Sequence, residues 1–291
     1  MKRETSEILS VHETTCNLCN GNQFLVLEEA QRPYRVLMCH NCSLVFVYPF
    51  PERGLLSEHY DRDYYQDWVT NQSKKRARMW LRRLKAIEKI KKTGTLLDVG
   101  CGDGSFLKLA QDRGWNVYGT ELSAYAVKKV ATFVGNRIFC GELGEAKHPG
   151  NMFDVVTLWH VLEHVTDPAA CLAEIQRIIK PDGLLVLAVP NIQDFLTPFA
   201  FRLLKGRRMK LFSPSDREIH LYHFSVNTLQ HYLEQQGFHR FSVMPDFGII
   251  DMRKKIINYI SLVAYYLIGY PAFSAIEMHA EPKMKGLKTQ P

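Results

Sequence analysis

Residues 96–107 read LLDVGCGDGSFL, an apolar run that ends on a carboxylate and turns through three glycines before it becomes apolar again. Glycine at positions 100, 102 and 104 allows backbone angles that a side chain would forbid, and it lets a ligand come close to the main chain. The pattern therefore predicts a strand, a tight turn and a helix, with a ligand held against the turn.

Apolar strands and helices alternate after this turn with short connections. Such alternation predicts an α/β fold with a parallel sheet that helices cover on both faces. The predicted strands are residues 95–99, 116–119, 137–140, 153–158 and 184–189.

The second of these strands ends in Gly119-Thr120-Glu121, about 20 residues beyond the first. A carboxylate at that place can accept hydrogen bonds from both hydroxyls of a ribose. The turn itself has the spacing GxGxG and lacks the last glycine of the dinucleotide fingerprint. Together the two features predict a nucleoside-type ligand across the carboxyl ends of adjacent strands.

Four segments in this order resemble the class I S-adenosylmethionine-dependent methyltransferases. They are DVGCGDGSF at 98–106, Glu121, FDVVTLWHVLEHVTDP at 153–168 and KPDGLLVLAVPN at 180–191. The resemblance covers about residues 95–245. It implies a Rossmann-like, mostly parallel sheet of the seven-stranded type, and methyl transfer from S-adenosylmethionine.

The resemblance also implies which residues hold the cofactor. The turn at Gly100, Cys101 and Gly102, with Asp98, would hold the methionine end. An alternative for Asp98 is a carboxylate that caps the turn, and one for Cys101 is a small buried apolar residue.

The resemblance implies three further contacts with the cofactor, at the ends of the next strands. Glu121 would bind the ribose hydroxyls, Leu122 would border the adenine, and Glu142 would lie near the adenine amine. The sequence after Glu142 departs from the common pattern of the family.

A separate cysteine module precedes this region. Two CxxC pairs, Cys16/Cys19 and Cys39/Cys42, are separated by nineteen residues and lie beside short β-rich runs. This spacing is typical of a zinc ribbon in which four thiolates close a tetrahedron, so the predicted Zn²⁺ is structural. A ribbon ahead of the methyltransferase domain resembles enzymes of sugar, polysaccharide and antibiotic pathways.

Histidines are the candidate catalytic residues, because a hydroxyl acceptor profits from a general base near neutral pH. His160 follows the fourth strand at the edge of the sheet where ligands bind, and His223 lies in the segment HLYHFS. We predict His160 and His223 as catalytic. His164 and His220 are their neighbours, with His164 interpreted as structural.

The predicted organisation has five parts. They are a disordered lead at 1–15, the ribbon at 16–52, a helical linker or lid at 53–94, the methyltransferase domain at 95–250 with a substrate-covering insertion at 192–222, and an apolar helix with a disordered tail at 251–291.

The sequence indicates the methyl acceptor less directly than it indicates the cofactor. The preferred interpretation is a hydroxyl of a small molecule, sugar, glycan or lipid-linked intermediate. The net charge of +7 and the basic stretch 72–92 leave nucleic acid as an alternative. A non-catalytic, cofactor-binding subunit is a second alternative.

The C-terminal apolar run from 256 to 276 carries no charge for 21 residues. Three interpretations of this run are open: a core or subunit-contact helix, an interfacial membrane helix, and a membrane span. The N-terminus lacks a secretory signal, so the sequence predicts a cytoplasmic protein, with peripheral contact at the inner face of the membrane as an extension.

Overall fold

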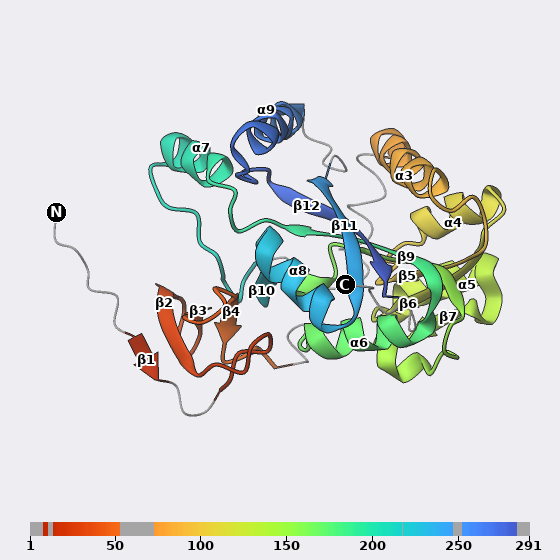
Figure 1. The fold of residues 1–291 in the computed structure, drawn as a ribbon, viewed down its shortest axis with the longest axis horizontal. Coiled ribbons are helices and arrows are strands. Elements are labelled where there is room, and N and C mark those ends of the chain that lie inside the picture. Colours follow the sequence, from red (N-terminus) through yellow and green to blue (C-terminus); the bar gives the residue numbers. More distant parts are fainter. Residues whose placement is uncertain (1–7, 11–13, 53–72, 217, 247–251, 284–291) are drawn as a thin grey trace, which may run out of the picture.

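The computed structural model describes residues 8–10, 14–52, 73–216, 218–246 and 252–283. Two sheets organise it (Figure 1). A seven-stranded sheet has the order β11-β12-β9-β8-β5-β6-β7. Its strands are β5 (Thr95–Val99), β6 (Asn116–Glu121), β7 (Ile138–Cys140), β8 (Phe153–Trp159), β9 (Ile179–Pro190), β11 (Phe238–Pro245) and β12 (Ala275–Pro282).

The centre of this sheet is parallel, as the strand and helix alternation predicts. β5 pairs in parallel with β6 and β8, and β8 pairs in parallel with β9. β12 is antiparallel to both of its neighbours, β9 and β11. The carboxyl ends of β5, β6 and β8 therefore meet at one edge, where α/β folds place their ligands.

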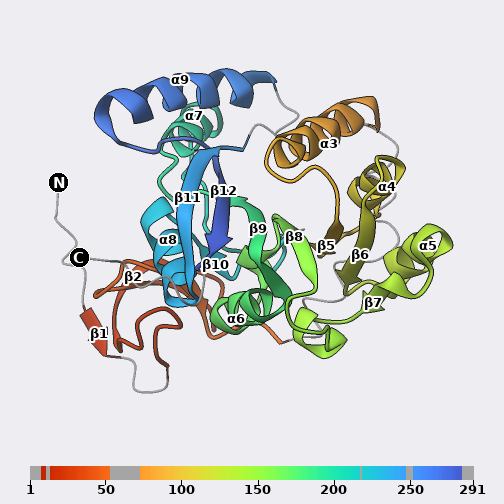
Figure 2. The ribbon, with the colours of Figure 1, turned by 45° about the vertical axis from the view of Figure 1, so that its right-hand side comes forward.

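Side chains of the central strands alternate between two hydrophobic cores. In β8, Val156 and Leu158 belong to one core and Val155 to the other. One face is covered by α3 (Ser73–Glu88), α4 (Ser105–Asp112) and α5 (Ala124–Val134), as Figure 2 shows. The other face packs on α6 (Pro168–Ile178) and α8 (Val226–Gln235). Two-sided burial explains why these strands read as nearly continuous apolar runs.

The second sheet is small and antiparallel, with the order β1-β2-β3-β4-β10. Its strands are β1 (Ile8–Ser10), β2 (Gln23–Glu29), β3 (Arg35–Cys39), β4 (Val45–Tyr48) and β10 (Tyr222–His223). β10 comes from far along the chain and pairs with β4, so the N-terminal module shares a sheet with the segment that leads into α8. The two parts also share one hydrophobic core.

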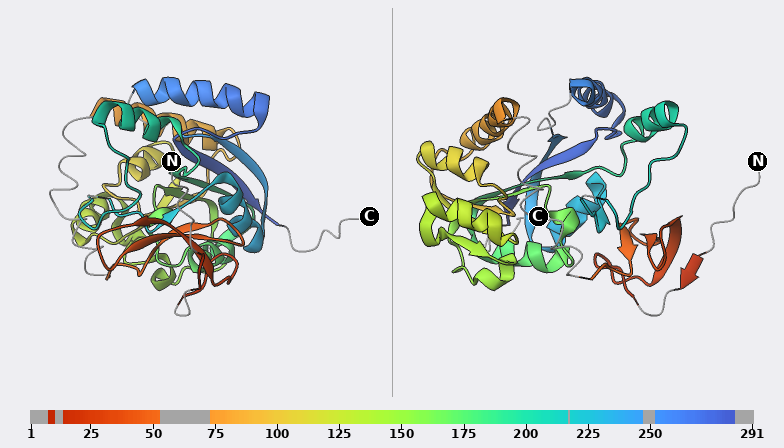
Figure 3. Two further views of the ribbon diagram at one scale, coloured as in Figure 1. Left: turned by 90° about the vertical axis from the view of Figure 1, so that its left-hand side faces the viewer. Right: turned by 180° about the vertical axis from the view of Figure 1, so that it is seen from behind.

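Two further helices lie next to each other at one side of the molecule (Figure 3). They are α7 (Leu196–Lys205), inside the predicted insertion, and α9 (Met252–Ile268), which overlaps the apolar C-terminal run at 256–276. In the part of the chain that the structure describes, no helix is long and apolar enough to cross a membrane.

Two expected boundaries differ from this architecture, and parts of two expected segments lie outside the described residues. The methyltransferase domain was predicted to end at residue 250, whereas β12 at 275–282 lies inside the main sheet between β9 and β11. The lead at 1–15 was expected to be disordered, whereas residues 8–10 pair with β2. Most of the predicted lid, residues 53–72, lies outside the described residues, as does the tail from 284.

Candidate functional site

The glycine turn connects β5 to α4 as expected. Gly100, Gly102 and Gly104 have φ of +65°, +54° and +73°, in the left-handed region that favours glycine. A Cβ on Gly100 would lie 2.6 Å from Cγ2 of Val161, and one on Gly104 would lie 2.7 Å from Cγ2 of Val130. The turn therefore needs glycine both for its backbone angles and for its close packing.

Glu121 fastens this turn to the end of the neighbouring strand. Its Oε2 accepts a hydrogen bond from the Gly102 amide at 2.9 Å, and its Oε1 accepts one from the Ser123 amide at 2.9 Å. The residue is 7% exposed. The structure thus brings Glu121 to the turn, where its carboxylate joins the ends of β5 and β6.

The two other residues predicted near an adenine lie farther along the same edge. Leu122 directly follows β6 and is 53% exposed, which is unusual for a leucine next to a buried strand. Glu142 follows β7 and caps the short helix η2 (Leu143–Ala146), where its side chain accepts a hydrogen bond from the Glu145 amide. The predicted set thus spans the carboxyl ends of β5, β6 and β7.

Asp98 lies beneath the turn and does not cap it. The residue is 2% exposed, and its Oδ1 accepts a hydrogen bond from the Thr157 hydroxyl at 2.7 Å. Burial raises the pKa of Asp98 to about 7, and the hydrogen bond only partly offsets that rise. The capping carboxylate is Asp103, whose Oδ1 accepts from the Ser105 amide at 3.0 Å.

Cys101 lies within the turn and is 7% exposed. Burial raises the pKa of its thiol well above the usual value, because a thiolate is poorly solvated there. The Cys101 side chain is therefore a neutral packing group, and the residue can offer a ligand only its backbone.

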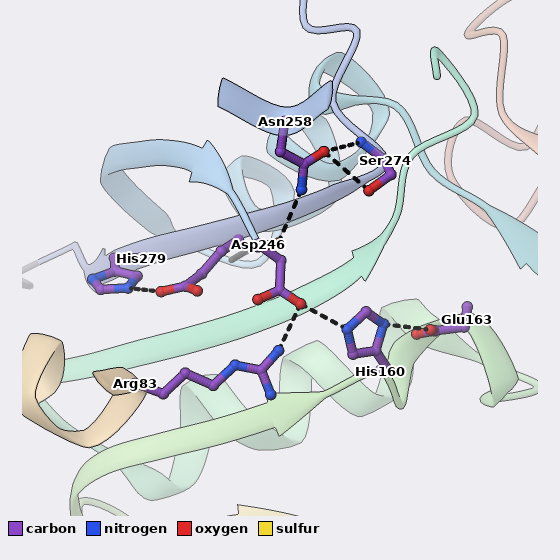
Figure 4. A network of polar contacts seen from close by, with 8 residues as sticks. Arg83, His160, Glu163, Asp246, Asn258, Ser274 and His279 are labelled. Atoms are coloured by element: carbon purple, nitrogen blue, oxygen red, sulfur yellow. Dashed lines mark hydrogen bonds and ion pairs between the residues drawn. The ribbon is translucent and has the colours of Figure 1, made fainter. Parts of the chain in front are cut away.

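His160 lies where β8 ends and belongs to a chain of alternating charges (Figure 4). Its Nε2 is 2.9 Å from Oδ2 of Asp246, and its Nδ1 is 3.5 Å from Oε1 of Glu163. Nη2 of Arg83 reaches the same Asp246 oxygen at 2.6 Å. Two cations and two carboxylates therefore alternate from α3 to the end of β8.

This chain of charges sets the protonation of His160. Burial would lower the pKa of the ring, but the hydrogen bond to Asp246 and the ion pair with Glu163 outweigh that effect and raise the pKa to about 9. Burial likewise disfavours the charged form of Asp246, yet Arg83 and His160 hold the pKa of Asp246 well below its usual range. His160 is thus an imidazolium at neutral pH, and it cannot accept a proton in that form.

The second predicted catalytic histidine is buried elsewhere. His223 lies in β10 opposite Val45 of β4 and is 8% exposed. Burial lowers the pKa of His223 to about 3, so its ring is neutral and a weak base. Its ring centroid is 6.3 Å from that of His220, which in turn lies 4.9 Å from the ring of His164.

The sequence interpretation missed Asp246 and Arg83. Asp246 follows β11 in a segment without a recognised motif, and Arg83 is one of many basic residues in α3. The one available signal was that Asp246 follows the β-rich stretch at 238–244, because ligand-binding side chains gather where the strands of α/β sheets end.

The four cysteines of the N-terminal module come together as their spacing predicts. Sγ of Cys16 is 3.5 Å from Sγ of Cys42, and Sγ of Cys19 is 3.5 Å from Sγ of Cys39. All four sulfur atoms lie within 4.8 Å of one another. Thiolates around a tetrahedral zinc ion are about 3.8 Å apart, so this donor set fits such an ion.

Comparison with known proteins supplies the family. Residues 70–242, more than half of the chain, match a family model described as a methyltransferase domain. A structure titled as a SAM-dependent methyltransferase from Archaeoglobus fulgidus superimposes with a TM-score of 0.54 at 17% identity, over 75% of this chain and 100% of that chain.

Curated relatives match over a shorter stretch. A ubiquinone biosynthesis O-methyltransferase of Thiobacillus denitrificans is 37% identical over 103 residues, which are 33% of this chain and 44% of that enzyme. A 2-methyl-6-phytyl-1,4-hydroquinone methyltransferase of Synechocystis is 36% identical over 105 residues, or 34% and 33% of the two chains. The match thus spans less than half the length of either relative.

Proposed function

This chain belongs to the methyltransferase-domain family, with the fold of S-adenosylmethionine-dependent enzymes, and from that premise we propose that it transfers a methyl group from S-adenosylmethionine to a small-molecule hydroxyl. The observation that carries the proposal is the glycine turn joined to Glu121 at the ends of β5 and β6. Such a backbone cradle with a ribose-binding carboxylate suits a nucleoside-type cofactor.

We assign the cofactor to the predicted residues. The turn at 100–102 and Asp98 hold the methionine end, Glu121 the ribose, and Leu122 and Glu142 flank the adenine. S-adenosylmethionine supplies a methyl group activated on a sulfonium. When it is bound, the acceptor oxygen would take that methyl group, the sulfur would keep the electron pair of the carbon–sulfur bond, and the hydroxyl proton would pass to solvent.

In this proposal His160 supplies a positive charge and helps to shape the acceptor end of the site. Because both ring nitrogens face carboxylates, the ring is held in one orientation beside Val161, which packs on the glycine turn. Its role is to fix the acceptor end of the site, and the general-base role expected from the sequence is not supported by its raised pKa.

Among the predicted acceptor classes, a lipid-linked hydroxyl has the most support. In α9 the polar Asn258 and Ser261 are buried and hydrogen-bonded, while apolar side chains face outward. The exposed side chains of α9 and the loop after it are Tyr259, Ile260, Val263, Tyr266, Leu267 and Tyr270. The neighbouring α7 segment exposes Phe195, Phe199, Leu203, Leu204 and Met209. We call these eleven residues the apolar face.

The apolar face is connected to the site. Nδ2 of Asn258 donates to the Asp246 carbonyl, and the Asp246 carboxylate binds His160. The apolar face is bordered by basic residues of the α7 segment: Arg202, Lys205, Arg207, Arg208 and Lys210. An acceptor with an apolar tail that lies in an anionic membrane surface would suit both the apolar face and the basic residues beside it. The two curated relatives, named for quinone and phytyl-hydroquinone methylation, agree with a tailed acceptor.

The nucleic-acid alternative finds less support in α3. Two of its arginines, Arg76 and Arg83, are buried and paired with Asp103 and Asp246. The basic stretch therefore serves partly to fasten the helix onto the domain.

The zinc proposal concerns stability. We propose that Cys16, Cys19, Cys39 and Cys42 hold one structural Zn²⁺.

Calorimetric titration with S-adenosylmethionine and S-adenosylhomocysteine tests the cofactor assignment. We expect binding by the native chain and a loss of roughly 1–3 kcal/mol in Glu121→Gln, which cannot accept from both amides and also bind a ribose. Glu234→Gln, at an exposed position of α8, is the control and should bind like the native chain.

Turnover is then followed with labelled methyl donor and lipid-tailed phenols or sugars as acceptors. Equal cofactor binding in Glu121→Gln would refute the site. Cofactor binding without product from any hydroxyl acceptor would favour the non-catalytic subunit.

A further inference from the structure

Glu163 is a buried carboxylate whose ion pair with His160 is long. It lies in η3 (Leu162–His164), directly after β8, and is 1% exposed. Among the described residues neither of its carboxylate oxygens receives a hydrogen bond, and its ion-pair partner, Nδ1 of His160, is 3.5 Å away. A buried charge in this state is costly unless a further cation or donor compensates it.

Two imidazoles lie next to this carboxylate. One ligand atom each from Glu163, His164 and His220 lie within 4.8 Å of one another. Neighbouring ligands around tetrahedral zinc are about 3.4 Å apart, so side-chain shifts of about an ångström would bring these atoms to bonding positions. The side chains come from two segments that meet here, because the Leu221 amide donates to the Glu163 carbonyl at 2.8 Å.

His164 has the orientation of a metal ligand. Its Nδ1 is 2.7 Å from the Ile219 carbonyl oxygen, and a carbonyl can only accept. A neutral ring in this contact carries its proton on Nδ1, so Nε2 is the nitrogen suited to a metal ion. Metal-binding histidines usually have one ring nitrogen fixed in this way by a carbonyl or carboxylate.

We propose that Glu163, His164 and His220 bind one divalent transition-metal ion of the zinc class. Two imidazoles and one carboxylate are typical ligands for such ions, and three protein ligands leave a coordination position open. This site differs from the four-cysteine site in its ligands and its location. The bound ion would neutralise the buried Glu163 charge.

The open position gives the site its chemical role, and this part rests on the proposed function. His160, which faces Glu163, is at the acceptor end of the proposed active site. An acceptor hydroxyl at the open position would be polarised by the ion and would lose its proton to solvent more easily before methyl transfer. This role needs no histidine base.

Cobalt(II) is the probe for the site. The full chain, loaded with zinc at the four cysteines, is titrated with Co²⁺ and followed by visible absorption. We expect one Co²⁺ per chain with ligand-field bands and without the thiolate charge-transfer band that cobalt at the cysteines would give.

Two variants identify the ligands. Glu163→Gln and His220→Asn should weaken Co²⁺ binding by more than roughly a hundredfold, since losing even an outer partner of a metal site costs about 10- to 100-fold. His231→Gln, an exposed histidine of α8, should bind Co²⁺ like the native chain. Retained S-adenosylhomocysteine binding shows that each variant is folded, and His220→Asn serves alone if the buried Glu163 variant does not fold.

The outcomes separate this site from the proposed function. Absence of Co²⁺ beyond the cysteine site, or equal binding by Glu163→Gln and the native chain, would overturn the metal proposal even if methyl transfer proceeds. Co²⁺ binding that requires Glu163 and His220 supports it, including in a protein that transfers no methyl group.

Discussion

At the scale of one residue, Asp98 shows how a side chain assigned to a binding site can lower the stability of the folded chain. The carboxylate is buried under the glycine turn and receives a hydrogen bond from Thr157. Because burial raises its pKa from 3.8 to about 7, folding favours the protonated form. The folded state therefore binds more protons than the unfolded state between about pH 4 and pH 7, and stability falls as the pH rises through that window.

Asp98→Asn should remove this fall. Asparagine keeps the shape and the oxygen that accepts from Thr157, and it carries no charge. We expect the variant to be more stable than the native chain by a few kcal/mol at pH 7, and to differ little at pH 4. Thermal melts from pH 4 to pH 8 measure the difference.

The same substitution should weaken S-adenosylmethionine binding, because Asp98 is assigned to the methionine end of the cofactor. Asp216→Asn, at an exposed position, is the control for the chemical change. A parallel pH dependence of the Asp98 variant and the native chain would show that the carboxylate is not the cause.

Residues in local patterns could be predicted, and residues in distant contacts could not. The glycines, Glu121 and the four cysteines are spaced regularly along the chain, and the structure brings them together as expected. Arg83 and Asp246 are 163 positions apart, and neither belongs to a motif. Their partnership is created by the fold alone.

At the scale of elements, one ion pair joins α3 to the end of β11. The side chains of Arg83 and Asp246 are 4% and 0% exposed. The Arg83 guanidinium also lies 4.2 Å from the ring centroid of Trp159 and 5.0 Å from that of Trp80. Asp246 thus balances Arg83 and His160 at once.

Asp246→Asn should remove the counter-charge of Arg83 and leave His160 paired only with Glu163. Breaking a buried pair by removing one partner costs about 3–5 kcal/mol, and we expect a loss of that size in urea unfolding. Asp112→Asn is the matched control, because Asp112 pairs with Lys108 on an exposed surface of α4, where such pairs contribute about 0–1 kcal/mol. A loss in Asp246→Asn no larger than in the control would contradict the role of the pair.

The apolar face of α7 and α9 is the second feature at this scale. Because its helices expose large apolar side chains beside basic ones, we expect the protein to sediment with anionic phospholipid vesicles and less with neutral ones. Replacing Tyr266 and Leu267, each 77% exposed, by serine should reduce the bound fraction several-fold.

Ile90→Ser, a 50% exposed apolar residue just after α3, is the control for this experiment. Vesicle binding unchanged by the double substitution would contradict the membrane interpretation. Dimerisation in solution that depends on the same two residues would instead assign the apolar face to a second copy of the chain.

Across the whole molecule, the sequence predicted the central sheet better than its edge. The strands β5, β8 and β9 contain continuous apolar stretches. The predicted ranges agree with β5 to β8 to within two residues, and the range predicted for β9 lacks residues 179–183 and 190. β12 was missed because it contains Glu277 and His279. Both are buried, and they pair through His279 Nε2 and Glu277 Oε1 at 3.0 Å. A polar pair inside a strand hides the apolar pattern on which the prediction relied.

The small sheet and the acceptor side of the site form one structural unit. β10 pairs with β4 through Tyr222 opposite Phe46, and the Val47 amide donates to the Leu221 carbonyl at 2.9 Å. His220, the proposed metal ligand, immediately precedes this pairing. The cysteine module therefore supports the segment that carries the acceptor-side histidines.

Loss of the proposed zinc should consequently affect the two halves of the proposed active site unequally. Cys16→Ser should release the zinc, unfold the small sheet and displace β10, because structural zinc sites supply folding free energy to small modules. S-adenosylhomocysteine affinity should change only a few-fold, since its proposed residues lie on β5, β6 and β7. Acceptor turnover should fall by at least tenfold.

Metal content, calorimetry and a methyl-transfer assay on the same samples measure the three effects. Cys171→Ser, a partly buried thiol outside the module, controls for the loss of a sulfur atom and should keep both zinc and turnover. A Cys16→Ser protein that retains one zinc per chain would refute the four-thiolate site. Parallel loss of cofactor affinity and turnover would show that the module supports the whole domain, because the effect of β10 would then extend beyond the acceptor side.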